Sequence, residues 1–344
     1  MEPNIDSLVE ILVSDAKKIA SSMDFKNLSN KKIIITGANG LIGINFLTSL
    51  IQISKNYSGI EIYPVIRSSP SEFLSPFLDN KEVTIFRGDL TDDQFIESLP
   101  SVDIIIHAAG SGIPSQFLSN KLSSLKINTI TTFKLFEKLN KKGRFLFISS
   151  SDLYNGLEAK KYSEDQIGTT NTNHPRACYI EGKRTGETIC NIYREMGIKA
   201  YSVRLSLTYG PGVSFEDSRV LPSFIRKALN GSIEMLDSGD VSRTFCYTSD
   251  AIEMMWFVLL NGNDSLYNIG GIENIKIKDL ANLIGKLLNV PVLYPSTDLS
   301  ILGAPQNVGI NINRFLLESK KEYFVELQEG LANTIDWLKH LKKI

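Results

Sequence analysis

The chain has 344 residues, of which 42% are hydrophobic and 22% are charged, and its formal net charge at pH 7 is −1. This is the composition of a globular protein, long enough for one large or two modest domains. The balanced charge argues against a nucleic-acid or membrane-surface binder. No apolar run approaches the ~20 residues of a transmembrane helix.

Three cysteines, Cys178, Cys190 and Cys246, are widely spaced along the chain. Their number and spacing argue against a disulfide framework or a zinc cluster and fit a reducing cytoplasm. The N-terminal sequence MEPNIDSLVE lacks the basic segment and apolar core of a signal peptide. We therefore predict a cytoplasmic protein with no metal site, no nucleic-acid partner and no membrane partner.

Residues 31–50 read KKIIITGANGLIGINFLTSL, a short apolar run that breaks into glycines before an apolar helical pattern. Strand, glycine turn and helix in this order are the context of a dinucleotide-binding fingerprint. Gly37 would take a backbone angle that other residues resist, Gly40 would let the chain approach a pyrophosphate, and Gly43 would let helix and strand pack closely. The pyrophosphate would then meet the free N–H groups of the helix start. The candidate cofactor ligands in this turn are Gly37, Asn39, Gly40, Leu41, Ile42 and Gly43.

Strands and helices alternate along the sequence that follows. Four more strands are expected, at residues 59–67, 83–86, 102–107 and 144–148, and a helix at residues 125–139. This alternation predicts a parallel sheet with right-handed crossovers, the doubly wound Rossmann form of the α/β class. We expect an N-terminal helical extension at 1–30, an NAD(P)-binding Rossmann domain at 31–203 and a smaller α/β part at 204–344 that mainly binds substrate.

The end of the second strand bears on the choice of cofactor. In a Rossmann unit, an acidic residue at this place holds the ribose hydroxyls of NAD. Here the strand ends at Arg67, and an arginine can accommodate the 2′-phosphate of NADP, so this single residue favours NADP over NAD. The alternative is an ordinary solvated arginine at a strand end.

Two other strand ends carry residues that suit a bound dinucleotide. Asp89, which is followed by Leu90, could accept a hydrogen bond from the adenine amino group or could form a turn. We interpret His107, the last residue of the fourth strand, as structural rather than catalytic. The small residues that follow it, which would let a flat cofactor lie close, are Ala108, Ala109 and Gly110.

The fifth strand ends in serines, and a Tyr-x-x-x-Lys sequence follows at Tyr179 and Lys183. Residues four apart share one helix face, and an ammonium near a phenol favours the phenolate. Such a phenolate could take a proton from a sugar hydroxyl while hydride leaves the same carbon for nicotinamide, and Ser150 would hydrogen-bond the same oxygen. Tyr-x-x-x-Lys alone is common on helix surfaces. After a glycine turn and a serine-rich strand end, it indicates oxidoreductase chemistry.

These motifs resemble the extended short-chain dehydrogenase/reductase family, in its nucleotide-sugar epimerase/dehydratase group, over roughly residues 30–340. The landmarks are TGANGLIG, HAAG, SSSDLY, the Tyr179/Lys183 pair and RLSLTYGPG. The stretches SLKINT, PRACYIEGKR, SRVLPSFI and SRTFCYTSD resemble the UDP-glucuronate decarboxylase members most closely.

The resemblance implies a role for the residues of these motifs. Tyr179 is the base, Lys183 is its helper and a ligand of the cofactor ribose, and Ser150 is the hydroxyl partner. Asp152 stands at a catalytic position where decarboxylases have glutamate. The residues on the substrate side are Ser151, Leu207, Val220 and Arg243, of which the arginine contacts the nucleotide diphosphate. A homodimer would form through helices near residues 115–140 and 175–197.

The sequence departs from the family pattern at several positions. Asp152 is one methylene shorter than glutamate, and with Ser151 it leaves the Asp-Glu pair of dehydratases incomplete. Leu207 and Gly212 replace an asparagine and an arginine that flank Thr-Tyr-Gly-Pro, and Asn307-Val308 replaces a double arginine. The loss of these donors predicts a sugar or nucleotide other than UDP-glucuronate.

We predict an enzyme that oxidises a nucleotide-bound hexose at C4 and acts as an epimerase or decarboxylase-like enzyme in the synthesis of surface-polysaccharide sugars. One alternative is an NADPH-dependent reductase of 4-keto nucleotide sugars, which Arg67 would suit. Another is a non-catalytic dinucleotide-binding sensor or scaffold, although a binder does not need Ser150, Tyr179 and Lys183 together.

Overall fold

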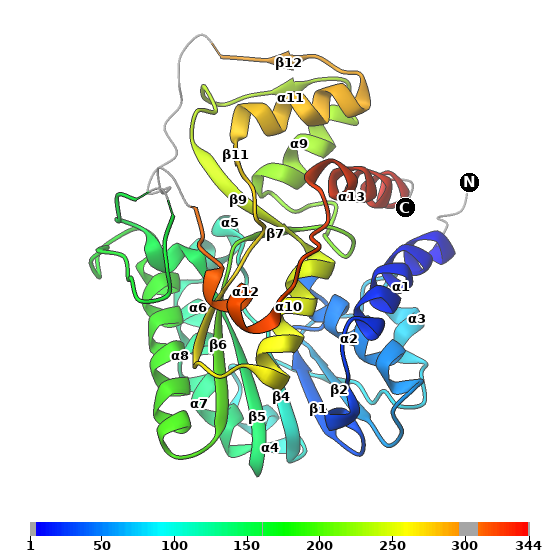
Figure 1. Ribbon diagram of the computed structural model, residues 1–344, viewed down its shortest axis with the longest axis vertical. Helices are drawn as coiled ribbons and strands as arrows, with labels where there is room; N and C mark the ends of the chain where they lie inside the picture. The colour runs from blue at the N-terminus through cyan, green and yellow to red at the C-terminus, as the bar shows by residue number, and fades with distance from the viewer. Residues whose placement is uncertain (1–4, 160, 296–308, 343–344) are drawn as a thin grey trace.

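A seven-stranded parallel sheet is the centre of the computed structural model, which describes residues 5–159, 161–295 and 309–342. The strand order is β10-β6-β5-β4-β1-β2-β3 (Figure 1). The strands are β1 (Lys32–Thr36), β2 (Glu61–Ile66), β3 (Phe86–Arg87), β4 (Val102–His107), β5 (Leu139–Ser150), β6 (Lys199–Leu205) and β10 (Leu266–Ile269). Every neighbouring pair is parallel, which confirms the predicted doubly wound Rossmann fold.

Alternate residues of the inner strands pack into two cores on opposite faces of the sheet. Ile33 and Ile35 of β1 belong to one cluster of buried side chains, and Ile34 between them belongs to the other. On β5, Leu146 joins the first cluster and Phe147 the second. Because successive side chains of a strand point to opposite faces, burial on both faces requires the continuous apolar runs seen in the sequence.

Helices cover both faces of this sheet. The helices α1, α2 and α10 pack on the first core, whereas α6, α7 and α8 pack together on the second. Their bounds, with those of the shorter helices, are α1 (Ile5–Ser21), η1 (Lys26–Leu28), α2 (Leu41–Ser54), α3 (Ser75–Leu78), α4 (Asp93–Ser98), α5 (Pro114–Ser119), α6 (Lys121–Asn128), α7 (Ile130–Glu137), η2 (Ser151–Tyr154), α8 (Ala177–Glu195) and α10 (Thr248–Asn261). In the described part of the chain, no helix has the length and apolar character needed to cross a bilayer.

A smaller part lies at one end of the main sheet (Figure 1). It contains a three-stranded sheet, β11-β9-β7, and a strand pair, β12-β8. Its elements are β7 (Leu207–Tyr209), α9 (Val220–Ala228), β8 (Ile233–Glu234), β9 (Ser242–Tyr247), β11 (Asn274–Lys276), α11 (Ile277–Leu288), β12 (Val292–Leu293), α12 (Asn313–Ser319) and α13 (Leu327–Leu341). Between β9 and β11 the chain returns to the main sheet as α10 and β10, so a domain boundary at residue 203 stays a prediction.

The N-terminal helix α1 packs against α2, α10 and α13. Leu8 and Leu12 on its inner face are completely buried. The buried carboxylate of Asp15 accepts a hydrogen bond of 2.8 Å from the Tyr247 hydroxyl, and burial raises the pKa of this carboxyl above its usual value. The N-terminal extension is therefore part of the main core, and it joins the first helix after the glycine turn to the smaller part.

The structure corrects two predicted elements. The helix expected at 125–139 is two helices, α6 and α7, separated at Thr129, whose φ of −119° and ψ of −83° are not helical. Its surroundings, Ile-Asn-Thr-Ile-Thr-Thr, are rich in β-branched residues of low helix propensity. The strand expected at 83–86 is β3 at Phe86–Arg87, and Val83 contributes only an isolated bridge to Ile62.

We expect Leu12→Ala to lower the free energy of unfolding of the whole protein by about 2–5 kcal/mol, because it opens a cavity between α1 and the core. Urea titration followed by circular dichroism would measure the change. Lys17→Ala, at an exposed position of the same helix, is the matched control, with an expected change below about 0.5 kcal/mol. Equal stability of Leu12→Ala and wild type would show that α1 does not support the core.

Candidate functional site

Two glycines of the turn after β1 allow close packing, and the third faces open space. Gly37 has a φ of +69°, and a Cβ on it would lie 2.8 Å from the Ala108 carbonyl oxygen. A Cβ on Gly43 would lie 2.2 Å from the Gly37 oxygen, so neither position accepts a side chain. A Cβ on Gly40 would meet only the Gly37 oxygen, at 3.4 Å. Space is therefore left open beside Gly40, at the start of α2.

This open space lies where the strand order of the sheet reverses, between β1 and β4. The first N–H groups of α2 have no partner within the helix, and they face this edge of the sheet. Leu41 and Ile42 are half-buried against the core, so they would offer backbone N–H groups rather than side chains. The Asn128 Oδ1 atom is buried without a hydrogen-bond partner among the described residues, 3.7 Å from where a Cβ on Gly110 would lie. These residues fit the pyrophosphate and ring of a dinucleotide.

Asn39 joins the glycine turn to the loop after β2. Its side chain donates to the Ser69 carbonyl oxygen at 3.1 Å and accepts from the Ser71 N–H at 2.9 Å. Arg67 is exposed at the start of this loop, and the guanidinium of Arg87 donates to the Ser69 hydroxyl at 3.0 Å. The loop thus has two arginines beside it, of which the sequence analysis named only Arg67.

The predicted turn role of Asp89 agrees with the structure, because its carboxylate accepts a hydrogen bond of 2.8 Å from the Thr91 N–H. Leu90 is a core residue. The Ala109 N–H donates to the Thr36 hydroxyl oxygen at 3.1 Å, which fixes the segment after β4 to the end of β1.

His107 is structural, as predicted. Its Nδ1 lies 2.8 Å from the Thr36 hydroxyl and its Nε2 lies 3.1 Å from the Ile127 carbonyl oxygen. The ring therefore donates from Nε2 and accepts at Nδ1. Burial lowers the pKa of His107 to about 3, so the ring is neutral at physiological pH. Its uncharged hydrogen bonds tie together β1, β4 and α6.

Tyr179, Lys183 and Ser150 come together where α8 packs on the end of β5. The Tyr179 ring stacks on Phe117, with 4.6 Å between ring centroids, and its hydroxyl is hydrogen-bonded to Ser150. The Lys183 Nζ donates to the Ile148 carbonyl oxygen at 2.6 Å. A Cβ on Gly112 would lie 3.8 Å from the Tyr179 hydroxyl, so this group borders the segment after β4.

Burial dominates the electrostatics of this cluster. It raises the pKa of Tyr179 to about 12, with the Asp152 charge adding to the rise and the Ser150 hydrogen bond opposing it. Burial also lowers the pKa of Lys183 to about 7. The expected lowering of the tyrosine pKa by Lys183 is therefore outweighed by loss of solvation in the protein alone.

Arginines line the side of the cluster that faces the smaller part. Asp152 forms an ion pair of 2.9 Å with Arg176, and Arg219 is paired with Asp217. The charges of Arg176 and Arg219 both lower the pKa of Tyr179, so both act on the reactive phenol. The sequence analysis quoted the PRACYIEGKR and SRVLPSFI stretches that contain these arginines without singling them out.

The candidate substrate residues have different surroundings. Ser151 is buried in η2, whereas Leu207 and Val220 are half-buried in β7 and at the start of α9 and pack against the core. The half-buried Arg243 donates to the Ser242 carbonyl oxygen, and the Asp152 charge raises its pKa against the stronger effect of burial. Asn307 and Val308 lie outside the described residues. The cysteines Cys178, Cys190 and Cys246 are free, and no group of three or more potential metal ligands occurs within the described ranges.

Comparison with known proteins gives three similarities. Residues 33–270 match the model of the NAD dependent epimerase/dehydratase family. UDP-glucuronic acid decarboxylase 1 of Xenopus tropicalis is 30% identical over 317 residues, covering 90% of this chain and 72% of that protein. A dTDP-4-dehydro-6-deoxy-D-allose reductase of Streptomyces sp is 26% identical over 332 residues, covering 92% of this chain and 98% of that protein.

Solved structures share the fold. The UDP-glucuronic acid 4-epimerase of Bacillus cereus, solved with UDP-glucuronic acid and NAD, superposes with a TM-score of 0.76 at 22% identity. The match covers 90% of this chain and 99% of the epimerase.

We expect Gly40→Ala to weaken dinucleotide binding at least about tenfold while changing the free energy of unfolding by less than about 1 kcal/mol, because its Cβ would enter only the open space. Gly43→Ala is the matched comparison, and its overpacked Cβ should cost about 1–3 kcal/mol of stability. Calorimetric titration with NAD and NADP, and urea unfolding, would measure the two effects. Unchanged cofactor affinity of Gly40→Ala would show that the dinucleotide does not approach this glycine.

Proposed function

Because the chain belongs to the NAD dependent epimerase/dehydratase family, we propose that this enzyme oxidises the hexose of a nucleotide-diphosphate sugar at C4 and acts as an epimerase or decarboxylase-like enzyme. The observation that carries the proposal is the cluster of Ser150, Tyr179 and Lys183 at the end of β5, next to the segment after β4. A dinucleotide-binding scaffold would not need these three groups together.

Each residue of the cluster has a defined task in this proposal. Tyr179 takes the proton of the sugar hydroxyl, so the pKa of its phenol must fall from about 12 to near the working pH. Ser150 donates a hydrogen bond to the reacting oxygen, and Lys183 offers its remaining N–H donors to the phenolate and to a ribose. Bound NAD or NADP would supply the hydride acceptor and, once oxidised, a positive charge beside the phenol.

The arginines beside the cluster support a diphosphate-bearing substrate. Guanidinium groups bind phosphate oxygens in a bidentate manner, and Arg219 and Arg243 come from the smaller part of the molecule. The Asp152–Arg176 ion pair presents both charge signs to the sugar. The shorter Asp152 side chain, against the glutamate expected from the resemblance, supports a sugar other than the glucuronate named for several relatives. A cytoplasmic role in surface-polysaccharide synthesis stays a prediction.

A second candidate is a reductase of 4-keto nucleotide sugars that consumes NADPH. The observation that favours it is the pair of arginines beside the loop after β2, Arg67 and Arg87, which would suit a 2′-phosphate. The similarity to the Streptomyces reductase also supports it. A tightly held cofactor that is not consumed would favour the epimerase or decarboxylase, whereas stoichiometric NADPH oxidation with a 4-keto sugar would favour the reductase.

We expect Tyr179→Phe to lower kcat by a factor of about 10²–10⁴, because the variant lacks the group that takes the proton. The substrate would first be found by mass spectrometry of products from a panel of UDP-, GDP-, CDP- and dTDP-sugars. Tyr193→Phe, on the same helix but stacked on Phe136, is the matched control and should keep wild-type turnover. Full turnover by Tyr179→Phe would refute the proposed mechanism.

We also propose that two copies of the chain associate through α6, α7 and α8. Six of the fourteen large hydrophobic side chains exposed in the described part lie on or directly after these three helices. They are Leu122, Leu125, Ile130, Phe133, Ile192 and Met196. A concentration of exposed apolar side chains is typical of a protein interface, and two equal faces can pair about a two-fold axis.

Leu122, whose side chain is 83% exposed, provides the test of this dimer. We expect Leu122→Glu to convert a dimer into a monomer, because the charge would lose its solvation at the interface. Light scattering after gel filtration would measure the mass. Leu317→Glu, at an equally exposed leucine on α12, is the control and should leave the dimer intact. A wild-type monomer, or a dimeric Leu122→Glu, would contradict the proposal.

A further inference from the structure

Three residues of α8, one helical turn apart, contact three successive residues at the end of β5. Tyr179 is hydrogen-bonded to Ser150, and Lys183 donates to the Ile148 carbonyl oxygen. One turn further, the Glu187 carboxylate accepts a hydrogen bond of 2.5 Å from the Ser149 hydroxyl. The third contact belongs to none of the roles assigned above.

Glu187 is fixed by an arginine from the neighbouring strand. Arg204 of β6, which stands opposite Ser149 in the strand register, donates to the two carboxylate oxygens of Glu187 at 3.0 and 2.9 Å. Both side chains of this ion pair are at most 9% exposed. Its geometry is bidentate, so the carboxylate cannot rotate away from its place beneath the catalytic cluster.

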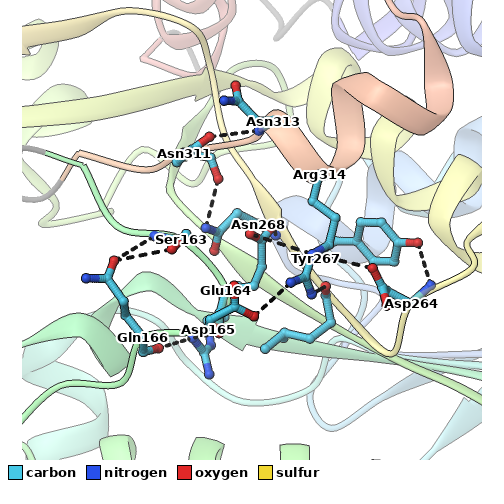
Figure 2. A network of polar contacts seen from close by, with 12 residues as sticks. Ser163, Glu164, Asp165, Gln166, Asp264, Tyr267, Asn268, Asn311, Asn313 and Arg314 are labelled. Atoms are coloured by element: carbon cyan, nitrogen blue, oxygen red, sulfur yellow. Dashed lines mark hydrogen bonds and ion pairs between the residues drawn. The ribbon is translucent and has the colours of Figure 1, made fainter.

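The other end of Arg204 binds the loop before α8. Its Nη1 donates to the carbonyl oxygens of Glu164 and Gln166, at 3.1 and 2.7 Å. Figure 2 shows this loop in a larger polar network, in which Glu164 accepts from the Asn268 N–H and Arg314 pairs with Asp165. Arg204 is therefore held on every side by hydrogen bonds, and Glu187 is held by Arg204.

Lys183, in contrast, has no carboxylate within ion-pair distance among the described residues. It is 5% exposed, and its ammonium lies 4.9 Å from the centroid of the Phe147 ring and 5.7 Å from that of Tyr179. A buried ammonium with one hydrogen bond is costly unless an opposite charge lies near. Glu187, four residues along the same helix face, is the carboxylate that acts on it.

The other charges around α8 leave Glu187 in this role. His107 of β4 is neutral, and Asp152 of η2 is paired with Arg176 at the start of the helix. The remaining charged groups on α6 and α7, at or near the surface, are Lys121, Lys126, Lys134 and Glu137, and two of these lysines pair with Asp93 of α4. On α8 itself, Arg184 pairs with Glu181, whereas Arg194 and Glu195 lie three turns away at the helix end.

We propose that Glu187 is a positioning residue whose carboxylate, fixed by Arg204 and Ser149, keeps the buried ammonium of Lys183 charged for the reaction. The proposal rests on the role given to Lys183 in the proposed function. Tyr179 and Lys183 touch the reacting groups, whereas Glu187 acts on them through Lys183 alone. A merely structural ion pair would lock α8 to β6 without affecting the protonation of Lys183.

The test measures the protonation of Lys183 directly. Wild type and Glu187→Gln would be labelled with [ε-¹³C]lysine and titrated by NMR, with the Lys183 signal assigned by its loss in Lys183→Met. Glu187→Gln keeps the shape and one acceptor of the side chain but removes the charge. We expect the pKa of Lys183 to fall by about one pH unit or more, from Coulomb attraction across one helical turn. The upper limb of the pH profile of kcat should move down by the same amount.

Two further variants separate charge from packing. Ser149→Ala removes a hydrogen bond to Glu187 but keeps its charge, so the Lys183 titration should be unchanged. Glu187→Gln/Arg204→Gln leaves no unpaired buried guanidinium, and it tests the same charge if Glu187→Gln alone does not fold. An unchanged pKa of Lys183 in either folded glutamine variant would overturn the inference. A lowered pKa with an unmoved pH profile would uphold the effect of Glu187 and refute the role of Lys183 in turnover.

Discussion

The burial of ionisable groups at the end of β5 is the constraint on which the site depends. Loss of solvation moves the pKa of Tyr179 up to about 12 and that of Lys183 down to about 7. Both shifts favour the neutral forms, whereas the proposed chemistry needs a phenolate beside an ammonium. The protein counters this tendency with fixed hydrogen bonds, from Ser150 to the phenol and from Lys183 to the Ile148 oxygen. The cluster is therefore held ready in geometry, and its charge state depends on further charges nearby.

The position of this cluster follows from how the main sheet is assembled. Gly37 and Gly43 bring the start of α2 against the end of β4, where a single methyl group would prevent the packing. Behind α2, Trp256 of α10 donates from its indole to the Ser49 hydroxyl, and α1 packs against both helices. The N-terminal helix thus stabilises the fingerprint helix from the side opposite the open space beside Gly40. Because interiors are close-packed, a loss of core contacts at α1 would be felt at the turn.

The arginines between the main sheet and the smaller part explain how a shared fold can serve different sugars. Tyr179 and Lys183 act on the ring carbon common to the substrates, whereas Arg176, Arg219 and Arg243 come from segments outside the glycine turn. Their pairing with Asp152 and Asp217 fixes where the guanidinium groups point. Small changes there, such as an aspartate in place of a glutamate, alter the contacts to the sugar without affecting the proton and hydride chemistry.

The sequence by itself determined the parallel sheet, the dinucleotide turn and the Ser150, Tyr179 and Lys183 cluster. These features depend on local patterns, namely apolar runs, glycine spacing and residues four apart on a helix. The break at Thr129 could not be foreseen, because packing of α6 and α7 on α8 outweighs local helix propensity there.

Only the tertiary structure decided which charges lie together. Glu187 and Arg204 are seventeen residues apart and look like ordinary solvated residues in the sequence, yet β6 pairs with β5 so that both are buried beneath Ser149. The sign of the tyrosine pKa shift was likewise decided by burial rather than by the neighbouring lysine. Solvation and long-range contacts depend on how distant segments pack, and no local pattern of residues contains that information.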